Sequence, residues 1–332
     1  MTPGSAQTSG APLLDVRALR VAFRTPDGVL EAVCGLSFSV DRGHVLGIVG
    51  ESGSGKSVAT QTVVGLTRGA RVTGEALFEG RNLLAMSPDE LRSVRGRGIA
   101  MVFQNPLSSL HPLYRIGWQI VEMIQAHEKV TKAQGRARAI ELLGLVGISR
   151  PDRRVDDYPH QFSGGMLQRA MIAMALALHP RLLVADEPTT ALDVTVQAQI
   201  IRLLGRVQQE FGTAIILITH DLGVIAEVAD EVIVMYAGRA MEVAPRRELF
   251  IAPSHPYTRG LLHAIPRADL AGGRLTPIPG QPPSLIARPP GCPFHPRCTE
   301  AVERCSREAP PLAALPGAVR HMSSCWLTEG NA

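Results

Sequence analysis

The sequence predicts an α/β fold with a mainly parallel sheet, followed by a smaller C-terminal region. Three apolar segments, 45–49, 182–185 and 213–221, have the length and composition of buried strands. Beyond residue 250 the composition changes, because proline and glycine become dense and exclude long regular elements. A chain of 332 residues with 45% hydrophobic residues is large enough to bury a sizeable core.

The charge and the chain termini limit the classes of protein to consider. A net charge of +4 is too small to indicate a nucleic-acid partner, so a mixed, solvated surface is expected. Residues 1–13 lack a basic segment followed by an apolar one, and this predicts a flexible leader. The longest apolar stretches, such as 171–178, fall short of the roughly 18–20 residues of a membrane span. We therefore expect a soluble, cytoplasmic protein.

A phosphate-binding loop follows the first strand. It has the pattern GxxxxGK[ST] and consists of Gly50, Glu51, Ser52, Gly53, Ser54, Gly55, Lys56 and Ser57. Glycines let backbone N–H groups turn around phosphate oxygens, and the helix that follows adds its positive end. Lys56 supplies a charge to the β- and γ-phosphates, and the Ser57 hydroxyl can bind Mg²⁺. The loop predicts binding of ATP with Mg²⁺.

Two acids end the second strand. Adjacent strand residues point to opposite faces, so Asp186 can face Mg²⁺ while Glu187 faces a water that attacks the γ-phosphate. The third strand ends at His220, toward the same edge of the sheet, where it can sense the γ-phosphate. These three side chains are the expected chemical complement of the loop.

The segment from Tyr158 to Asp193 resembles the signature region of ATP-binding cassette (ABC) ATPases. Ser163, Gly164 and Gly165 precede an amphipathic helix, whose positive end faces an anion. In the family that anion is the γ-phosphate of ATP bound to a second subunit. The resemblance therefore implies a pair of cassettes that enclose two nucleotides.

The same resemblance implies further site residues. Gln104 matches the glutamine that contacts Mg²⁺ and the water, Asp193 matches a residue that crosses to the partner, and His220 matches the switch histidine. Phe23 lies where the family places an aromatic ring against adenine, although a buried strand phenylalanine is an equal interpretation.

The family resemblance also implies a domain organisation. We expect a P-loop NTPase cassette over 14–250, with a RecA-like core, an antiparallel β subdomain near 14–45 and an α-helical subdomain near 105–175. A small Cys-containing extension is expected over 251–332.

The C-terminal region resembles that of the ATPase subunits of oligopeptide and dipeptide importers, in "HPYTRGLLHAIP" and "GCPFHPRC". This implies a peripheral ATPase at the cytoplasmic face of the membrane, working with a second, distinct ATPase subunit, two permeases and an extracytoplasmic peptide-binding protein. Import of another solute, such as nickel, is one alternative. A soluble ABC ATPase acting on nucleic acid or ribosomes is another, but the chain lacks a second cassette or an inserted coiled coil.

Four cysteines lie in this region, at Cys292, Cys298, Cys305 and Cys325. Their spacing differs from that of common zinc ribbons. Four thiolates can bind zinc or a 4Fe–4S cluster, and unligated thiols are a further interpretation. The importer resemblance implies the cluster, with zinc as the alternative metal. A redox-sensing regulator is a third function that the cysteines suggest. The nearby His295 and His321 are expected at the surface.

Overall fold

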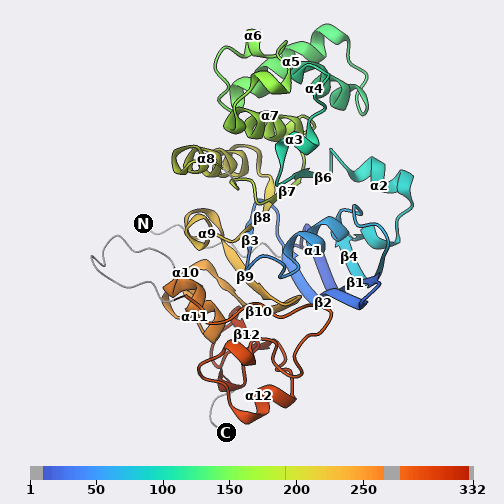
Figure 1. The fold of residues 1–332 in the computed structure, drawn as a ribbon. Coiled ribbons are helices and arrows are strands. Elements are labelled where there is room, and N and C mark those ends of the chain that lie inside the picture. Colours follow the sequence, from blue (N-terminus) through green and yellow to red (C-terminus); the bar gives the residue numbers. More distant parts are fainter. Residues whose placement is uncertain (1–9, 191, 265–276, 329–332) are drawn as a thin grey trace.

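The computed structural model describes residues 10–190, 192–264 and 277–328. A central sheet separates a mainly helical part from a C-terminal segment, and these lie at opposite ends of the molecule (Figure 1). A second, smaller sheet lies beside the central one. Most of the predicted leader, residues 1–9, lies outside the described residues.

The described residues form a central sheet of eight strands. In spatial order the strands are β11 (Ala313–Ala314), β12 (Met322–Ser323), β10 (Arg239–Pro245), β9 (Glu231–Tyr236), β3 (Val45–Val49), β8 (Ala214–Thr219), β7 (Leu182–Asp186) and β6 (Ile99–Val102). The strands from β9 to β6 are parallel, whereas β10 and β12 pair antiparallel. The three strands predicted from apolar segments are confirmed.

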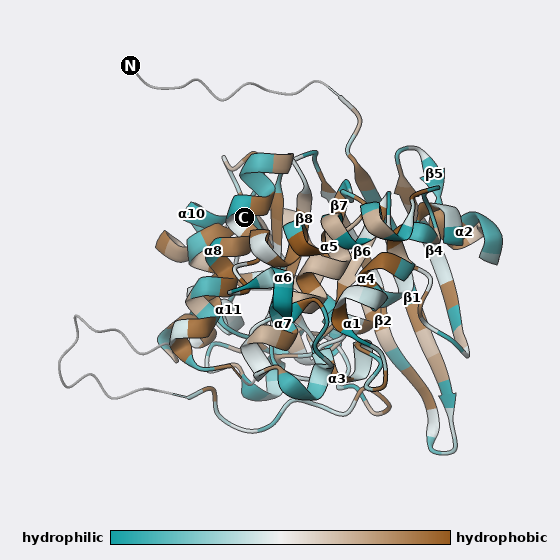
Figure 2. Cartoon of the chain, turned by 90° about the horizontal axis from the view of Figure 1, so that it is seen from above, coloured by the Kyte–Doolittle hydropathy of each residue, from teal (hydrophilic) through white to brown (hydrophobic). Residues whose placement is uncertain are grey.

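Both faces of the parallel strands are buried, which explains their continuous apolar sequences. In β3, Val45 and Val49 pack into one hydrophobic core, while Leu46 and Ile48 pack into another on the opposite face. Successive strand residues point to opposite faces, so one sheet supports two cores. Figure 2 shows strongly apolar segments such as β8 in the interior, between the surrounding helices.

The second sheet covers one of these cores. It contains β1 (Leu14–Thr25), β2 (Gly28–Val40), β4 (Ala70–Phe78) and β5 (Arg81–Asn82), in the order β2-β1-β4-β5. Its strands pair antiparallel, as the sequence predicts for residues 14–45. The β1–β2 hairpin carries Phe23 to the side of the phosphate-binding loop.

Most helices surround the central sheet or form the helical part at its β6 end (Figure 1). They are α1 (Lys56–Val63), α2 (Pro88–Val94), α3 (Pro106–Ser109), α4 (Ile116–Gln125), α5 (Lys132–Leu145), α6 (Pro151–Arg154), α7 (Gly164–Leu176), α8 (Val194–Phe211), α9 (Leu222–Val228), α10 (Arg246–Ile251), α11 (Pro256–His263) and α12 (Glu303–Arg307). Helices α3 to α7 lie in the region predicted to be helical. Single-turn 3₁₀ helices occur at η1 (Leu83–Ala85), η2 (Pro159–Gln161), η3 (His295–Arg297) and η4 (Trp326–Thr328).

The C-terminal segment is built mostly from loops and packs onto the β10 edge of the sheet. Strand β12 pairs with β10, so the segment continues the main sheet. Part of it also runs beside β2 (Figure 1), where Arg288 donates a hydrogen bond to the Glu31 carbonyl at 2.7 Å. The segment thus contacts both sheets.

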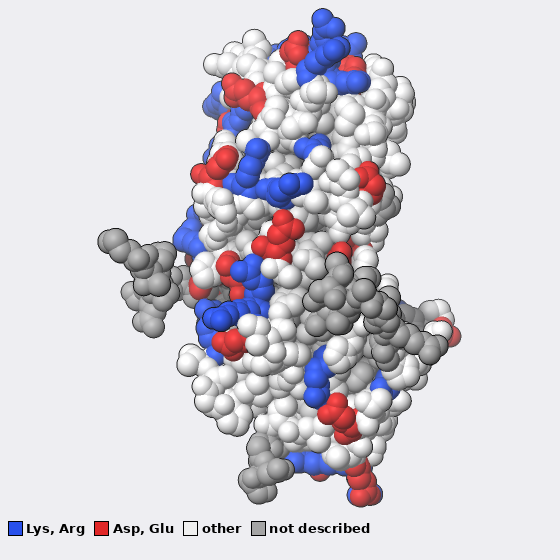
Figure 3. Space-filling view, turned by 90° about the vertical axis from the view of Figure 1, so that its left-hand side faces the viewer, with Lys and Arg blue, Asp and Glu red and all other residues white. Residues whose placement is uncertain are grey.

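Within the described residues, no helix has the length and apolar character needed to cross a membrane. On the face drawn in Figure 3, Lys and Arg side chains are interspersed with Asp and Glu. The described residues include ion pairs of such side chains, for example Arg136 with Asp156 at 2.8 Å. This face has the mixed charge that the composition predicts.

Candidate functional site

The phosphate-binding loop joins β3 to α1, and its shape depends on two glycines. Gly50 has φ +151°, and a Cβ there would lie 2.1 Å from the Met235 carbonyl oxygen. Gly55 has φ +97°, and its Cβ would lie 2.3 Å from the Ala32 carbonyl oxygen. Both positions combine a backbone angle that L side chains avoid with backbone contact, so only glycine fits.

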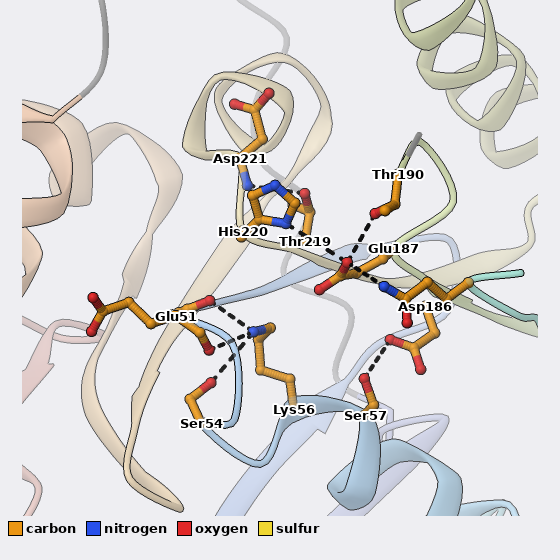
Figure 4. A network of polar contacts seen from close by, with 12 residues as sticks. Glu51, Ser54, Lys56, Ser57, Asp186, Glu187, Thr190, Thr219, His220 and Asp221 are labelled. Atoms are coloured by element: carbon orange, nitrogen blue, oxygen red, sulfur yellow. Dashed lines mark hydrogen bonds and ion pairs between the residues drawn. The ribbon is translucent and has the colours of Figure 1, made fainter. Parts of the chain in front are cut away.

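Lys56 begins α1, and its ammonium group lies inside the curve of the loop. Nζ donates to the carbonyl oxygens of Gly50 at 2.7 Å and Glu51 at 3.0 Å, and approaches Ser54 Oγ at 3.4 Å (Figure 4). Burial lowers the pKa of Lys56, and the charges of Glu187, Asp186 and Glu51 oppose this shift. The ammonium is held where it can meet phosphate oxygens.

Asp186 ends β7 and contacts the start of α1. Ser57 Oγ donates to Asp186 Oδ1 at 2.7 Å, and Gln61 Nε2 approaches Oδ2 at 3.4 Å. Burial raises the pKa of Asp186, and the hydrogen bonds from Ser57 and Gln61 oppose this shift. A hydroxyl and a carboxylate side by side are the oxygen ligands that Mg²⁺ prefers, so these residues fit the ion.

Glu187 follows directly, in a left-handed turn with φ +45°. Gln104 Nε2 donates to its Oε2 at 2.9 Å and Thr190 Oγ1 donates to the same atom at 2.8 Å. His220 Nδ1 lies 3.7 Å from this oxygen (Figure 4). No hydrogen-bond partner for the other carboxylate oxygen, Oε1, occurs among the described residues. One oxygen is thus held while the other is free.

These side chains surround one cavity of about 810 Å³. Its lining includes most predicted site residues: Phe23, Glu51, Ser52, Gly53, Ser54, Gly55, Lys56, Ser57, Gln104, Glu187 and His220. Leu30, Ala32, Val58, Pro282 and Leu285 complete the lining. The volume and the mixture of an apolar side with a charged side suit a nucleotide.

The signature residues lie elsewhere. Ser163 caps α7 by accepting a hydrogen bond from Met166 N at 3.4 Å, and Asp193 caps α8 by accepting one from Val196 N at 2.9 Å. The two caps are neighbours, because a Cβ on Gly165 would lie 2.7 Å from Val196. Ser163, Gly164 and Asp193 are exposed and do not line the cavity as described. The single chain therefore does not bring them to the phosphate loop.

Comparison with known proteins gives the chain a family. Residues 33–190 match the family model described as ABC transporter, and residues 241–305 match the oligopeptide/dipeptide transporter C-terminal region. The chain is 51% identical over 310 residues to the oligopeptide transport ATP-binding protein OppD of Salmonella typhimurium, covering 93% of this chain and 92% of that one. It is 47% identical over 323 residues to the dipeptide transport ATP-binding protein DppD of Bacillus subtilis, covering 96% of each.

The chain belongs to the oligopeptide/dipeptide ABC transporter ATPase family. A solved dimeric ATP-binding cassette, MJ0796 in a post-hydrolysis state with ADP and Pi, is 27% identical with a TM-score of 0.64. The match covers 70% of this chain and 99% of that one. The predicted cassette fold and the predicted importer-type ATPase are therefore confirmed.

The metal site predicted at the four C-terminal cysteines is wrong. In the ranges 10–190, 192–264 and 277–328, no group of three or more His, Cys, Asp or Glu residues can hold a metal ion. This contradicts the 4Fe–4S cluster, and its zinc alternative, assigned to Cys292, Cys298, Cys305 and Cys325. None of the four forms a disulfide bond.

Burial favours the protonated form of three of these cysteines. It raises the pKa of Cys292 to about 11 and also raises those of Cys298 and Cys325, whereas metal ligands are thiolates. Cys292 and Cys305 belong to the hydrophobic core together with Phe294. The cysteines therefore act as small apolar side chains in the C-terminal segment.

The surface location predicted for His321 is also wrong. His321 is 4% exposed, and its Nε2 lies 2.7 Å from Glu242 Oε1. Glu242 is fully buried and accepts further hydrogen bonds from Ser254 N at 2.7 Å and His255 N at 2.9 Å. His295 is half-buried, with Nδ1 2.9 Å from the Cys292 carbonyl oxygen. Both histidine side chains therefore contact other residues of the same chain.

The sequence did not predict several residues of the site. Gln61 lies one helical turn after Ser57, and this spacing could have identified it. Thr190 lies three residues after Glu187, within reach of a turn. Pro282 and Leu285 carry no signal, because their place in the cavity depends on how the C-terminal segment folds back.

Proposed function

We propose that this chain binds Mg·ATP in the 810 Å³ cavity and hydrolyses it to drive import of di- or oligopeptides. The observation that carries the proposal is that one cavity gathers Lys56, Gln104, Glu187 and His220, with Ser57 beside Asp186. No residue type required for ATP hydrolysis is missing from this arrangement. The names of the similar transport proteins support peptides as the solute.

The phosphate loop holds ATP at its charged end. The backbone N–H groups of 50–57 and the Lys56 ammonium bind the β- and γ-phosphates, and the start of α1 adds its positive end. Phe23 and Leu30 line the apolar side, where they contact the nucleobase. The loop is already curved around Lys56, so little ordering accompanies binding.

Ser57 and Asp186 hold Mg²⁺, with Gln104 as a further contact. Bound Mg²⁺ neutralises the charge of the phosphate oxygens. Gln61 orients the second oxygen of Asp186. The hydrogen bond between Ser57 and Asp186 keeps both oxygens on the same side of the site.

Glu187 positions the attacking water and accepts its proton. Gln104 and Thr190 fix Oε2, and Oε1 is left to face the water. His220, whose Nδ1 lies 3.7 Å from Glu187 Oε2, contacts the γ-phosphate and senses its presence. Because Gln104 lies between β6 and α3, it links Glu187 to the helical part of the chain.

A second cassette completes each site. Ser163, Gly164, Gly165 and Asp193 lie away from this chain's own cavity, at exposed helix N-termini suited to an anion. They face the γ-phosphate of ATP bound to the other subunit. That subunit is a related but distinct ATPase, and the dimeric MJ0796 cassette supports pairing in general.

The ATPase pair acts on two permeases from the cytoplasmic face, and an extracytoplasmic peptide-binding protein delivers the solute to them. An apolar cavity of about 290 Å³ lies between β6 and α7 and includes Met101, Phe103 and Met171. Phe103 directly precedes Gln104, so a permease segment seated there connects to Glu187 through adjacent residues. This continuity favours a permease segment as the occupant.

Reconstitution of the complex tests the function. With the permeases and binding protein in proteoliposomes, ATP should drive uptake of di- and oligopeptides, and the Glu187→Gln variant should bind ATP but lose at least about a hundredfold in turnover. Uptake of nickel but no peptide would assign another solute. Recovery of the native protein with nucleic acid and no permease would contradict a transport function.

A further inference from the structure

Glu51 occupies a position in the phosphate loop where the pattern accepts any residue. Its main chain takes part in the loop, because its carbonyl oxygen accepts a hydrogen bond from Lys56 Nζ at 3.0 Å. Its side chain points away from Lys56 (Figure 4). A free carboxylate so close to the site would repel the phosphates of ATP. The Glu51 carboxylate therefore requires a positively charged partner.

The partner is Arg297, 246 residues away in the C-terminal segment. Its Nη1 donates to Glu51 Oε2 at 2.6 Å and its Nη2 donates to Oε1 at 3.1 Å, which makes a two-pronged ion pair. The Arg297 side chain is 5% exposed and that of Glu51 is 27% exposed. Water screens such a pair much less than a surface pair.

Arg297 is itself fixed from two other directions. Nε donates to the Pro279 carbonyl oxygen at 2.8 Å, and Nη1 also approaches the Tyr236 hydroxyl at 3.2 Å. Burial alone would lower the pKa of Arg297, but the hydrogen bonds to Glu51 and Tyr236 raise it above its ordinary value. The guanidinium is thus a rigid charged group.

Tyr257 of α11 holds the same loop residue through its backbone. The Glu51 N–H donates to the Tyr257 hydroxyl at 3.0 Å, and Tyr257 is fully buried. Its ring packs against that of Tyr236, with centroids 4.7 Å apart. Side chain and N–H of Glu51 are therefore both held from residues beyond 235, while its carbonyl faces Lys56.

The same segment reaches the apolar side of the cavity. Pro282 and Leu285 line it together with Phe23 and Leu30. Arg288, whose side chain is 14% exposed, binds Glu31 in the adjoining hairpin. The C-terminal segment therefore contacts the nucleotide cavity at both its phosphate and its apolar ends.

We propose that Arg297 is a positioning residue for ATP binding, which neutralises Glu51 and holds the phosphate loop in its binding shape. This rests on the proposed ATP site and extends it to the C-terminal segment. The segment becomes part of the ATP-binding machinery, because loss of one guanidinium both releases the loop and exposes the phosphates to a carboxylate.

The test is the affinity of the full-length chain for a fluorescent ATP analogue with Mg²⁺. Arg297→Gln should raise Kd about tenfold, since it removes the charged partner of Glu51. The double variant with Glu51→Gln should return to within about threefold of wild type, because no unpaired carboxylate remains. A double variant as weak as Arg297→Gln, or an unchanged Kd in Arg297→Gln, would overturn the proposal.

Arg259→Gln is the matched control. Arg259 binds both Glu300 oxygens, at 2.9 and 2.8 Å, within the same C-terminal region but away from the loop. The Kd of the Arg259→Gln variant for the ATP analogue should stay within about twofold of wild type. An equal loss of affinity in Arg259→Gln would mean that the effect comes from general loosening of the segment, and would overturn the proposal.

Arg297→Lys keeps the charge and guards against misfolding of the glutamine variant. Lysine cannot make the two-pronged contact, so Kd should rise about threefold, and wild-type affinity would overturn the proposal. In steady-state kinetics the Arg297→Lys defect should appear as a higher KM for ATP, and a fall in kcat with an unchanged KM would overturn the proposal. Failure of the wild-type chain to bind the analogue would instead contradict the ATP site itself.

Discussion

The Gln104 side-chain amide donates a 2.9 Å hydrogen bond to Glu187, and so connects two segments 83 residues apart. Gln104 follows β6, at the entry to the helical part, whereas Glu187 follows β7. The neighbouring strands β6 and β7 pair in parallel, which brings the ends of both to the same edge of the sheet. The hydrogen bond therefore joins Glu187 to the start of the helical part.

Gln104→Ala should lower kcat for ATP by about tenfold to a hundredfold and change ATP affinity by less than about threefold. The reason is that the variant removes a hydrogen bond to a carboxylate, worth about 1.5–3 kcal/mol, and leaves the phosphate loop intact. Steady-state kinetics of the assembled complex would measure this. Gln125→Ala is the control, since Gln125 binds the Val130 carbonyl at the end of α4. Equal losses in the two variants would contradict a direct role for Gln104.

Gly50→Ala should abolish ATP binding, with Kd raised at least about a hundredfold. Its Cβ would lie 2.1 Å from the Met235 carbonyl oxygen, and φ is +151°, so the loop backbone must move. Isothermal titration with ATP would measure the loss. Gly212→Ala introduces a milder backbone strain, at φ +64° with no atom within 4 Å, and should lower stability without changing Kd. Normal ATP binding by Gly50→Ala would show that the loop tolerates a side chain.

Asp186→Asn should raise the melting temperature of the nucleotide-free chain by about 2 °C in EDTA at neutral pH. Burial raises the pKa of Asp186 above that of the unfolded chain, so the ionised carboxyl destabilises the fold above that pKa. The same variant should lose the Mg²⁺-dependent gain in ATP affinity. Asp27→Asn, which changes an exposed carboxyl in the turn between β1 and β2, is the control. An unchanged or lower melting temperature would contradict the destabilising role of Asp186.

Acid should weaken the C-terminal segment through His255, which caps α11 by accepting a hydrogen bond from Tyr257 N at 3.0 Å. Burial, with a smaller effect of the Arg259 charge, lowers the pKa of His255 to about 3, against about 6.5 unfolded. Below pH ~6.5 the unfolded chain gains a proton that the folded chain does not. The unfolding free energy should therefore fall by about 2 kcal/mol between pH 6.5 and pH 5.

The His255→Asn variant tests whether the loss of stability in acid comes from His255, because asparagine can cap the helix but does not titrate. Urea denaturation at pH 7 and pH 5 should show a loss smaller by about 2 kcal/mol in the variant than in wild type. His263→Asn, on an exposed site of the same helix, should lose as much as wild type. Equal acid losses in wild type and His255→Asn would rule out His255 as the source.

The local patterns in the sequence were sufficient for the cassette. A strand followed by Gly50 to Ser57 predicts a phosphate loop, because glycine spacing and the following helix determine the backbone locally. The apolar segments before Asp186 and His220 predict parallel strands, and parallel strands bring their carboxyl ends to one edge. The fold and most lining residues of the ATP cavity follow from these short-range rules.

The C-terminal region was different, because its side chains depend on distant partners. The importer resemblance implied a metal site at four cysteines, but the residues that the structure describes contain no metal-binding group, and burial raises the pKa of the Cys292 thiol. His321 looked like a surface residue until the fold placed it beside Glu242, 79 residues earlier. Composition does not predict such contacts, because a loop-rich segment lacks the regular hydrophobic periodicity that identifies a buried face.

Resemblance to a known family identified an importer-type ABC ATPase from the sequence, through the phosphate loop, the Asp186–Glu187 pair, the signature and the C-terminal segment. The contact between Arg297 and Glu51 emerged from the fold alone. That contact closes a loop of 246 residues, and no short-range rule predicts which surfaces a Pro-rich tail will cover. One part of the proposed ATP site is therefore predictable from local motifs. The other part depends on contacts with the distant C-terminal segment.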